Sequence, residues 1–374
     1  MSNFTSRPVL RWAVPAAAAV AVVGAGVAAK TLAVAAEPDL PPRTAAQLLV
    51  DLQTARLDGL SGTVVERADL GLPAIPLLTG DQSAKLSSLV AGKHTLRVWY
   101  SGPDKARVSL LGTQGQSDII HNGNDTWIWD SQAKEAQHFT GSPQDGDKPG
   151  ARPTPTDLPT SPQEAADLAL KAIDSTTQVT TGNSARIAGR NAYELVLRPR
   201  DTASLVGEVR LAIDAQEKLP LRVQVLPRGT ANPAFEVAFT QVSFTRPDNA
   251  EFAFNPPADT KVTEGNDAVK AAQGQEQEQQ HAGATGEKPK TAVVGTGWTS
   301  VLVLRSSGAG AGANADEAKK AQDAIGQLPA GNGGRTFNSK LVSVLFTDDG
   351  RVLIGSVTPE KLTQVAADPA AQLK

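Results

Sequence analysis

Alternating apolar and polar positions run through the first two thirds of this chain, a pattern typical of strands with one buried face. In one such segment Leu96, Val98 and Tyr100 alternate with more polar neighbours. The same period of two recurs further along, over residues 208–213, 221–225 and 235–239. About ten such segments follow one another with short turn-forming sequences between them, as consecutive hairpins do. We therefore expect one large antiparallel sheet.

Two segments have the helical period instead. Residues 45–58 place apolar side chains three and four apart, with Thr44 as a plausible N-cap and Asp58-Gly59 as the end. Residues 163–174 repeat this pattern in the middle of the strand series. Strands and helices do not alternate regularly, so a doubly wound α/β fold is disfavoured and a mainly β (α+β) fold is expected.

Residues 70–93 fit neither period. They form an apolar excursion between two strands, and its length exceeds that of a tight turn. The apolar side chains that we single out here are Leu72, Ile75, Leu77, Leu78, Leu86 and Leu89. One interpretation is a loop whose leucines cover a sheet edge, and the other is a lid that closes an apolar cavity.

The N-terminus has the pattern of an export signal. Arg7 and Arg11 precede residues 12–29, which carry no charge and are rich in alanine; Lys30 interrupts this run, and residues 31–36 are apolar again. Both a cleaved signal peptide and a retained membrane anchor formed by residues 12–36 fit this segment. In either case we expect the remainder of the chain to be extracytoplasmic.

Low-complexity stretches divide the rest. Residues 264–290 are rich in Gln, Glu and Gly and are predicted to be a disordered linker. They separate a large β-rich domain, residues 37–263, from a small C-terminal α/β unit, residues 291–374. In that unit we expect four elements: a strand over 293–304, a helix over 316–328, a hairpin over 340–357 with Asp348-Asp349-Gly350 as its turn, and a short helix over 359–367.

Composition narrows the chemistry. The formal net charge is −3, so binding of nucleic acid through bulk positive charge is disfavoured. The chain has no cysteine and only four histidines, which lie far apart, and this argues against thiolate chemistry and a metal site. No nucleophile elbow and no phosphate-binding loop are present. We therefore expect no enzyme activity, cofactor or metal.

Two pairs of side chains have open interpretations. Trp127 and Trp129 share one face of a predicted strand, either as core aromatics or as part of a cavity wall or an exposed docking patch. Arg97 and Arg107 are expected to be solvent-facing ion partners, and the alternative is a hydrogen bond from the guanidinium to a backbone carbonyl that latches a lid.

Several of these features together resemble the LolA/LolB/RseB superfamily, which includes MucB. They are the export signal, the early helix, the first strand over 60–66, the "LPLR" sequence at 219–222 and the ending FAFNPP at 252–257. The resemblance covers about residues 40–260. It implies an unclosed β-barrel with a helical lid and an apolar cavity that accepts acyl chains. The second, smaller unit is similar to the layout of the RseB (MucB) branch.

Two functions follow as hypotheses. In the first, the protein is a carrier or sensor that holds lipid or lipoprotein acyl chains beneath the 70–93 segment, with Trp127 and Trp129 in the cavity wall. Binding would come from burial of apolar surface and would need no specific polar motif. In the second, it is a regulatory protein whose two units clasp an anti-sigma factor or another membrane partner of the cell envelope.

Overall fold

The structure is a computed structural model. It describes residues 38–71, 91–113, 115–141, 175–265, 290–305, 319, 322–323, 325–331 and 333–372. The predicted export segment, the predicted helix over 163–174 and nearly all of the predicted linker lie outside these residues. Within them, no helix is long and apolar enough to span a bilayer.

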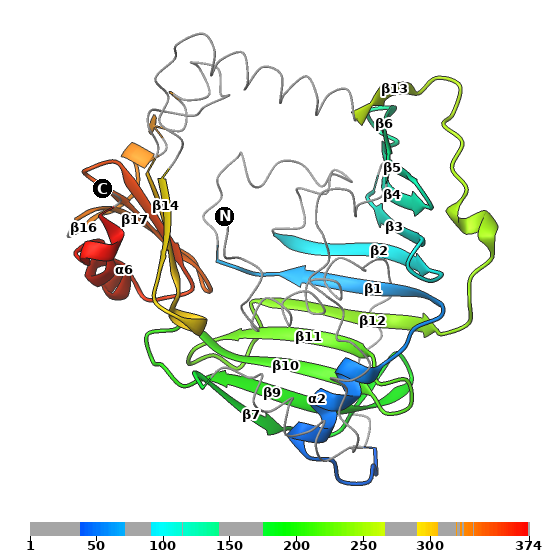
Figure 1. The fold of residues 1–374 in the computed structure, drawn as a ribbon, viewed down its shortest axis with the longest axis horizontal. Coiled ribbons are helices and arrows are strands. Elements are labelled where there is room, and N and C mark those ends of the chain that lie inside the picture. Colours follow the sequence, from blue (N-terminus) through cyan, green and yellow to red (C-terminus); the bar gives the residue numbers. More distant parts are fainter. Residues whose placement is uncertain are drawn as a thin grey trace, which may run out of the picture.

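A thirteen-stranded sheet forms the larger part of the molecule (Figure 1). Its strands are β1 (Leu60–Ala68), β2 (Gly92–Tyr100), β3 (Lys105–Leu111), β4 (Gln116–Asn122), β5 (Asp125–Asp130), β6 (Glu135–Thr140), β7 (Thr177–Thr181), β8 (Ala185–Ile187), β9 (Arg190–Pro199), β10 (Val206–Asp214), β11 (Pro220–Pro227), β12 (Phe235–Ser243) and β13 (Lys261–Glu264). The order along the sheet is β13-β6-β5-β4-β3-β2-β1-β12-β11-β10-β9-β7, and β8 pairs with β9.

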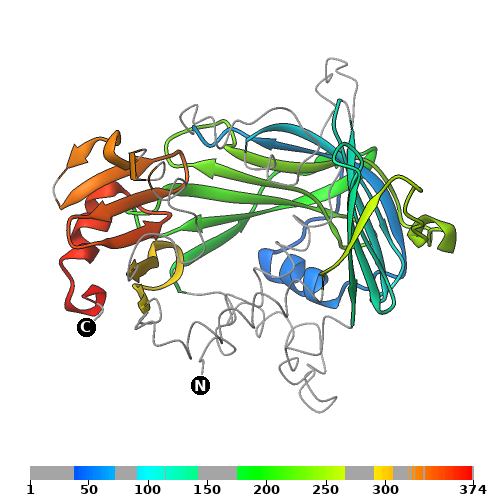
Figure 2. The same ribbon diagram turned by 90° about the horizontal axis from the view of Figure 1, so that it is seen from above.

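The sheet is strongly curved but open. Strands β3–β6 bend away from strands β7–β12, so that the sheet has an inner and an outer face (Figure 2). Its two end strands, β13 and β7, do not pair with each other. The prediction of a mainly β fold with an unclosed barrel is therefore confirmed.

One pairing departs from the predicted antiparallel pattern. After β12 the chain passes through η3 (Asn249–Phe252) on the outer side of the sheet and reaches β6 in the parallel direction. Residues 244–260 lead from the end of β12 to this edge of the sheet, where β13 aligns with β6. The sheet is thus mixed, with a single parallel pair at one edge.

Helix α2 (Ala45–Thr54) begins where the sequence predicts it. The Thr44 hydroxyl accepts from the Gln47 amide, and the Gln47 side chain accepts from the Thr44 amide, which is a complete capping box. The helix ends at Thr54 rather than at residue 58. The following residues lead into β1, and a Cβ at Gly59 would lie only 2.3 Å from the Cα of Arg246. Gly59 therefore allows a close backbone approach and does not end the helix.

A second, six-stranded sheet forms the C-terminal part. Its order is β14 (Lys290–Val294), β15 (Val301–Arg305), β19 (Arg351–Gly355), β18 (Ser343–Thr347), β17 (Gly334–Asn338) and β16 (Ala330–Gly331). One face packs on α6 (Pro359–Ala366) through a core that includes Val303, Leu345 and Leu362. The predicted 340–357 hairpin and the C-terminal helix are confirmed, because β18, β19 and α6 lie there.

The strand predicted over 293–304 is wrong in one respect. It consists of two strands, β14 and β15, which pair with each other across a turn that contains η4 (Gly297–Thr299). Gly295 and Gly297 have φ of 89° and 57°, values that favour glycine. A Cβ at Gly295 would also lie 2.9 Å from the carbonyl oxygen of Thr299. These two glycines reverse the chain in the middle of an apolar run.

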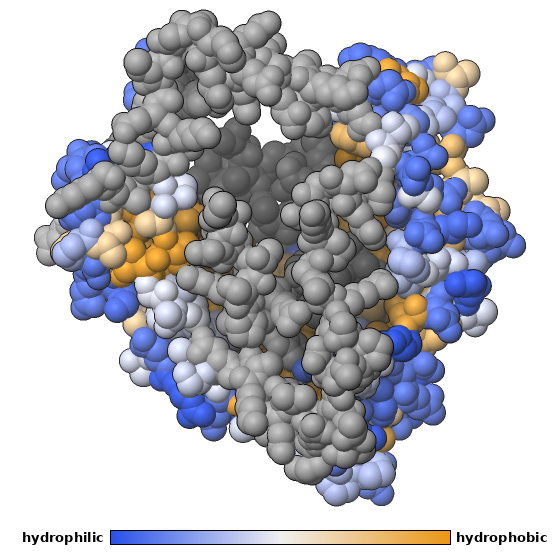
Figure 3. All heavy atoms as spheres, viewed as in Figure 1, coloured by the Kyte–Doolittle hydropathy of each residue, from blue (hydrophilic) through white to orange (hydrophobic). Residues whose placement is uncertain are grey.

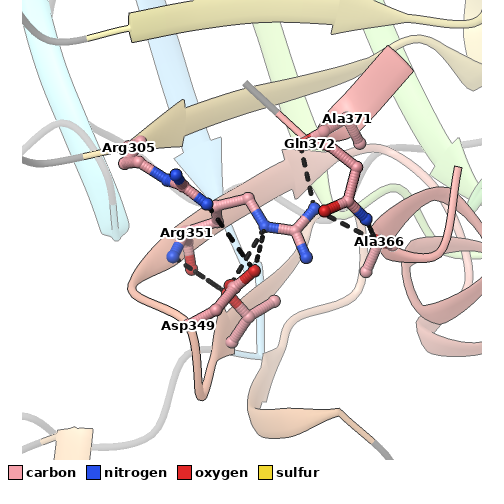
Figure 4. Close-up of polar contacts among 7 residues, drawn as sticks. Arg305, Asp349, Arg351, Ala366, Ala371 and Gln372 are labelled. Carbon is pink, nitrogen blue, oxygen red and sulfur yellow. Dashed lines mark hydrogen bonds and ion pairs between the residues drawn. The ribbon is translucent and has the colours of Figure 1, made fainter. Parts of the chain in front are cut away.

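A buried arginine ties the C-terminal helix to the second sheet (Figure 4). The Arg351 guanidinium donates to the carbonyls of Ala366 at 3.0 Å and Ala371 at 2.9 Å, and its Nε donates to Asp349 at 2.8 Å. This contact lowers the pKa of Asp349 to about 2. Asp349 therefore acts as a partner of Arg351 in the turn, in agreement with its prediction as a turn residue.

Replacing Arg351 with methionine is expected to destabilise the C-terminal unit by about 1–3 kcal/mol, because buried carbonyl oxygens lose their donors. Hydrogen exchange of the β18 and β19 amides should show faster opening. The matched control is Arg305→Met, since Arg305 contacts Asp349 only at 3.7 Å and should cost less than about 1 kcal/mol. Equal protection in the two variants would contradict this role of Arg351.

The two sheets are joined by direct contacts. The Leu205 amide donates to the Ser356 carbonyl at 2.9 Å, and the Thr358 amide donates to the Ala203 carbonyl at 2.9 Å. Leu341 and Trp298 from the C-terminal part pack with Val206 and other residues at the end of the larger sheet. The Trp298 indole also donates to the Thr177 hydroxyl at 2.7 Å. The C-terminal unit is thus docked on the described larger sheet.

Candidate functional site

The inner face of the larger sheet is a continuous apolar surface. Strand alternation and register bring Val64 opposite Leu96, Leu96 opposite Leu110, and Val237 opposite Val223. These five side chains form one buried cluster, with Val108, Val209, Leu211, Phe235 and Phe239 packed around it. We call this set of residues the inner-face cluster. Among the described residues it consists of strand side chains alone.

Helix α2 covers one end of the same face. Its Leu48 and Leu49 pack against Leu195 and Ile213 of β9 and β10. Leu211 contacts both this group and the inner-face cluster, so the two lie side by side on one surface. Figure 1 shows α2 beside β9, and Figure 2 shows the helix within the curve of the sheet.

One acid lies in this apolar surface. Glu66 follows Val64 by two residues on β1, so its side chain points to the same face, and it is only 4% exposed. Neither carboxyl oxygen has a hydrogen-bond partner in the described part of the chain. Burial without a partner raises the pKa of Glu66 to about 7. The carboxyl is therefore about half protonated at neutral pH.

Among the described residues, the neighbours of Glu66 supply no cation that pairs with it. Its register partners are His94 on β2 and Val237 on β12. The His94 ring nitrogen Nε2 lies 2.8 Å from the Ala91 carbonyl, to which it donates. Arg67 points to the opposite face and pairs with Glu236 at 3.2 Å. Glu66 is thus a polar group held within an otherwise apolar wall.

The connection that contains the predicted lid begins and ends beside this acid. Ala68 at the end of β1 pairs with Gly92 at the start of β2, so both ends of the 69–91 connection meet at one place. The C-terminal unit holds its beginning: the Lys340 amide donates to the Leu70 carbonyl at 2.7 Å, and Lys340 Nζ contacts Asp69 at 2.6 Å. The predicted site residues Leu72, Ile75, Leu77, Leu78, Leu86 and Leu89 themselves lie outside the described residues.

The two predicted tryptophans share one face of β5, as expected, but it is the outer face. Trp127 is the register partner of Ile120. The rings of Trp127 and Trp129 both contact Phe254, with ring centroids 5.3 Å and 5.7 Å from that of Phe254. The Trp127 ring also stacks on His138 at 4.1 Å. The structure therefore separates Trp127 and Trp129 from the inner-face cluster and places them beneath the chain that leads to β13.

Arg107 also lies on the outer face. It was expected to face solvent, but its side chain is only 19% exposed. It donates to the fully buried Asp118 at 2.9 Å and to the Glu251 carbonyl at 3.0 Å. Arg107 is thus an ion partner, as predicted, but it is not solvent-facing, and the carbonyl that it contacts lies in η3 and not in the predicted lid. Arg97 is exposed on the same face.

Sequence reasoning did not single out Glu66, although a signal was present. Leu60, Val64 and Glu66 fall on one side of β1 when the strand period is applied, so an acid occupies an apolar position. The described residues contain no group of three or more His, Cys, Asp or Glu placed to hold a metal ion.

The second sheet presents another apolar surface, opposite α6. Val293 and Leu302 face each other across β14 and β15 and are 42% and 38% exposed. Strand alternation places Ile354 and Val344 on the same side, next to Leu302. We call these four residues the free face of the second sheet. Figure 3 shows an apolar area over this part of the molecule.

The open, curved sheet, its apolar inner face and the short N-terminal helix fit the resemblance to the LolA/RseB superfamily. The model of the MucB/RseB N-terminal domain matches residues 146–262. A comparison with curated proteins finds no match. The resemblance to the LolA/RseB superfamily predicted from the sequence is thereby confirmed at the level of the superfamily.

Solved structures similar to this chain include MucB in the Pseudomonas aeruginosa MucA/MucB complex, with 17% identity and a TM-score of 0.41. That match covers 86% of this chain and 96% of the other. MucB in complex with MucA(peri) is 16% identical over 86% of this chain and 94% of the other, with a TM-score of 0.41. A LolA superfamily protein from Nitrosomonas europaea is 11% identical over 57% of this chain and 99% of the other, with a TM-score of 0.22.

Proposed function

We propose that this chain is an extracytoplasmic binding protein, without enzyme activity, that holds the acyl chains of a lipid or lipoprotein against the inner face of its larger sheet. The observation that carries the proposal is the inner-face cluster: a wide, curved, apolar surface that the described helices cover only at the α2 end. The match to the MucB/RseB domain supports the same class of protein.

The energetics of such a site require no polar motif. Each buried CH2 group of an acyl chain contributes about 0.8 kcal/mol, so a chain that is only partly buried still binds. We further propose that the leucines of residues 72–90 lie over this face, because both ends of their connection meet at the Ala68–Gly92 pair. This arrangement would enclose the chains between sheet and connection.

Filling the inner face should reduce binding. In Val108→Trp, a large ring enters the edge of the inner-face cluster and is expected to weaken binding of an environment-sensitive apolar dye by about fivefold or more, which corresponds to about 1 kcal/mol. The matched control is Val65→Trp, which places the same ring on the outer face of β1 and should leave binding unchanged. Dye titration of both variants measures the effect, and equal loss in both would contradict the proposed site.

Native mass spectrometry of the protein purified from its host membrane is the complementary test. We expect a bound mass in the range of a membrane lipid, and release of that mass on treatment with mild detergent. A protein that is always free of lipid, and that binds no apolar dye, would rule out the proposed function.

A second candidate function is regulatory: capture of an anti-sigma factor or another membrane protein of the envelope. The observation that favours it is the free face of the second sheet, since exposed apolar residues in contact with one another mark interaction surfaces. The solved complexes of MucB with MucA show that a similar protein binds a protein partner.

Polar substitution of the free face separates the two functions. The double variant Val293→Thr with Leu302→Thr should reduce co-purification of an envelope protein while acyl-chain binding stays intact. Val262→Thr is the matched control, because Val262 is 44% exposed and lies on β13, in the other sheet. Co-purification unchanged by the double variant would exclude the free face as the partner site.

A further inference from the structure

The Glu66 carboxyl has no hydrogen-bond partner among the described residues. Buried polar side chains in folded proteins nearly always form hydrogen bonds, and one left without them costs free energy. Glu66 is buried, both of its oxygens lack a partner in the described part of the chain, and its neighbours Val64 and Val237 are apolar. This cost is repaid if a bound molecule supplies the missing hydrogen bond.

We propose that Glu66 is the polar anchor of the acyl-chain site and that its neutral carboxylic acid donates a hydrogen bond to an ester carbonyl of an acylglycerol group. The inference rests on the proposed function and gives its ligand a chemical class. The acyl chains would lie on the inner-face cluster, and the ester group that joins them to glycerol would lie at Glu66.

The surroundings favour an uncharged partner over a cation. A buried ion pair requires desolvation of both charges, and further hydrogen bonds are needed to offset that cost. No side chain in the described part of the chain supplies such bonds to Glu66. A protonated carboxyl donates one hydrogen bond, and an ester carbonyl accepts one, so the two satisfy each other without burying a charge. Burial of Glu66 raises its pKa to about 7, so the donor form is available at neutral pH.

Few other titratable groups lie around Glu66. His94 is opposite on β2, β12 presents the apolar Val237, and Asp69 and Lys340 pair with each other beyond the end of β1. Because His94 is the register partner of Glu66 and is itself ionisable, the test must separate the effects of the two residues.

The test compares two soluble lipids that differ only in the ester group: 1,2-dioctanoylglycerol and its diether analogue, 1,2-dioctylglycerol. At pH 6 the wild-type protein should bind the ester lipid about tenfold more tightly, the effect of one hydrogen bond. The preference should decline at pH 9, as Glu66 ionises. In Glu66→Leu it should be absent at both values, while the diether still binds.

Three further variants test whether the ester preference comes from Glu66. Glu66→Gln keeps a neutral donor, so its ester preference should persist and no longer depend on pH. His94→Gln should retain the pH dependence, and Glu236→Gln on the outer face should match the wild type. Equal binding of the two lipids by the wild type, or an ester preference that survives in Glu66→Leu, would overturn the proposal for Glu66 alone. Failure of both lipids to bind would overturn the proposed function together with it.

Discussion

Arg107→Met is expected to lower the free energy of unfolding of the larger sheet by about 3–5 kcal/mol, because it leaves a buried carboxylate without its ion partner. Asp118 is fully buried, and among the described residues its carboxylate accepts, apart from Arg107, only from the Gln116 side-chain amide, at 2.9 Å. The substitution also removes the donor to the Glu251 carbonyl, which holds η3 and its buried Phe252 against the outer face. Urea unfolding followed by tryptophan fluorescence measures the loss, since Trp99, Trp127 and Trp129 lie in this sheet.

The control for this prediction is Arg97→Met, which removes an exposed arginine from the same face and should change stability by less than about 0.5 kcal/mol. Adding Asp118→Leu to Arg107→Met should recover part of the lost stability, because the unpaired charge is then absent. A single variant as stable as the wild type, or a double variant less stable than the single one, would show that the pair does not stabilise the sheet.

Glu66→Gln is expected to stabilise the protein in alkaline solution and to have little effect in acid. The pKa of Glu66 rises from 4.5 to about 7 on folding, so the folded state binds the proton more tightly than the unfolded state. Its contribution to stability is therefore fully present below pH 4.5 and is lost as the pH rises through about 7. The difference of about 2.5 pKa units corresponds to about 3 kcal/mol, which the neutral glutamine does not lose.

Urea unfolding of the ligand-free wild type and of Glu66→Gln, at about pH 5 and about pH 9, measures this difference in stability. The gap between Glu66→Gln and the wild type should open with rising pH, towards about 3 kcal/mol. Glu236→Gln should show no such gain in alkaline solution, because the Glu236 carboxylate is paired with Arg67 on the outer face. A gap that is constant over this pH range would mean that Glu66 ionises at its ordinary pKa.

Much of the fold follows from local signals in the sequence. Period-two alternation locates strands such as β2, β11 and β12, and the Thr44–Gln47 capping box marks the start of α2. Asn122-Gly123 forms the turn between β4 and β5, with Gly123 at φ 65°. These features depend on residues within a few positions of one another, which is why sequence reasoning finds them.

The features that sequence reasoning missed depend on residues that are far apart in the sequence. The parallel pairing of β13 with β6 depends on where the chain arrives after η3, which strand alternation does not encode. Arg107 is partly buried because residues 249–252 cross over β3, more than a hundred positions away in the sequence. The two glycines that form the turn, Gly295 and Gly297, are visible in the sequence. Because apolar residues lie on both sides of them, the segment was predicted as one strand.

The candidate site was predicted only in part. The superfamily resemblance and an apolar surface for acyl chains were expected, yet Trp127 and Trp129 lie on the outer face, because alternation alone does not say which side of a curved sheet a strand face joins. The role of the 72–90 leucines stays a prediction. Strand alternation already places Glu66 at an apolar position of β1, but its lack of a hydrogen-bond partner among the described residues is visible only in the structure.

Photo-crosslinking tests the central claim most directly. A diacylglycerol that carries a diazirine near the end of one acyl chain is bound to the intact protein and irradiated, and the modified residues are mapped by mass spectrometry. We predict modification of the inner face, at strand positions such as Val64, Leu96 and Val223. Modification confined to the outer face, or to the free face of the second sheet, would contradict the proposal that the curved sheet holds acyl chains on its inner side.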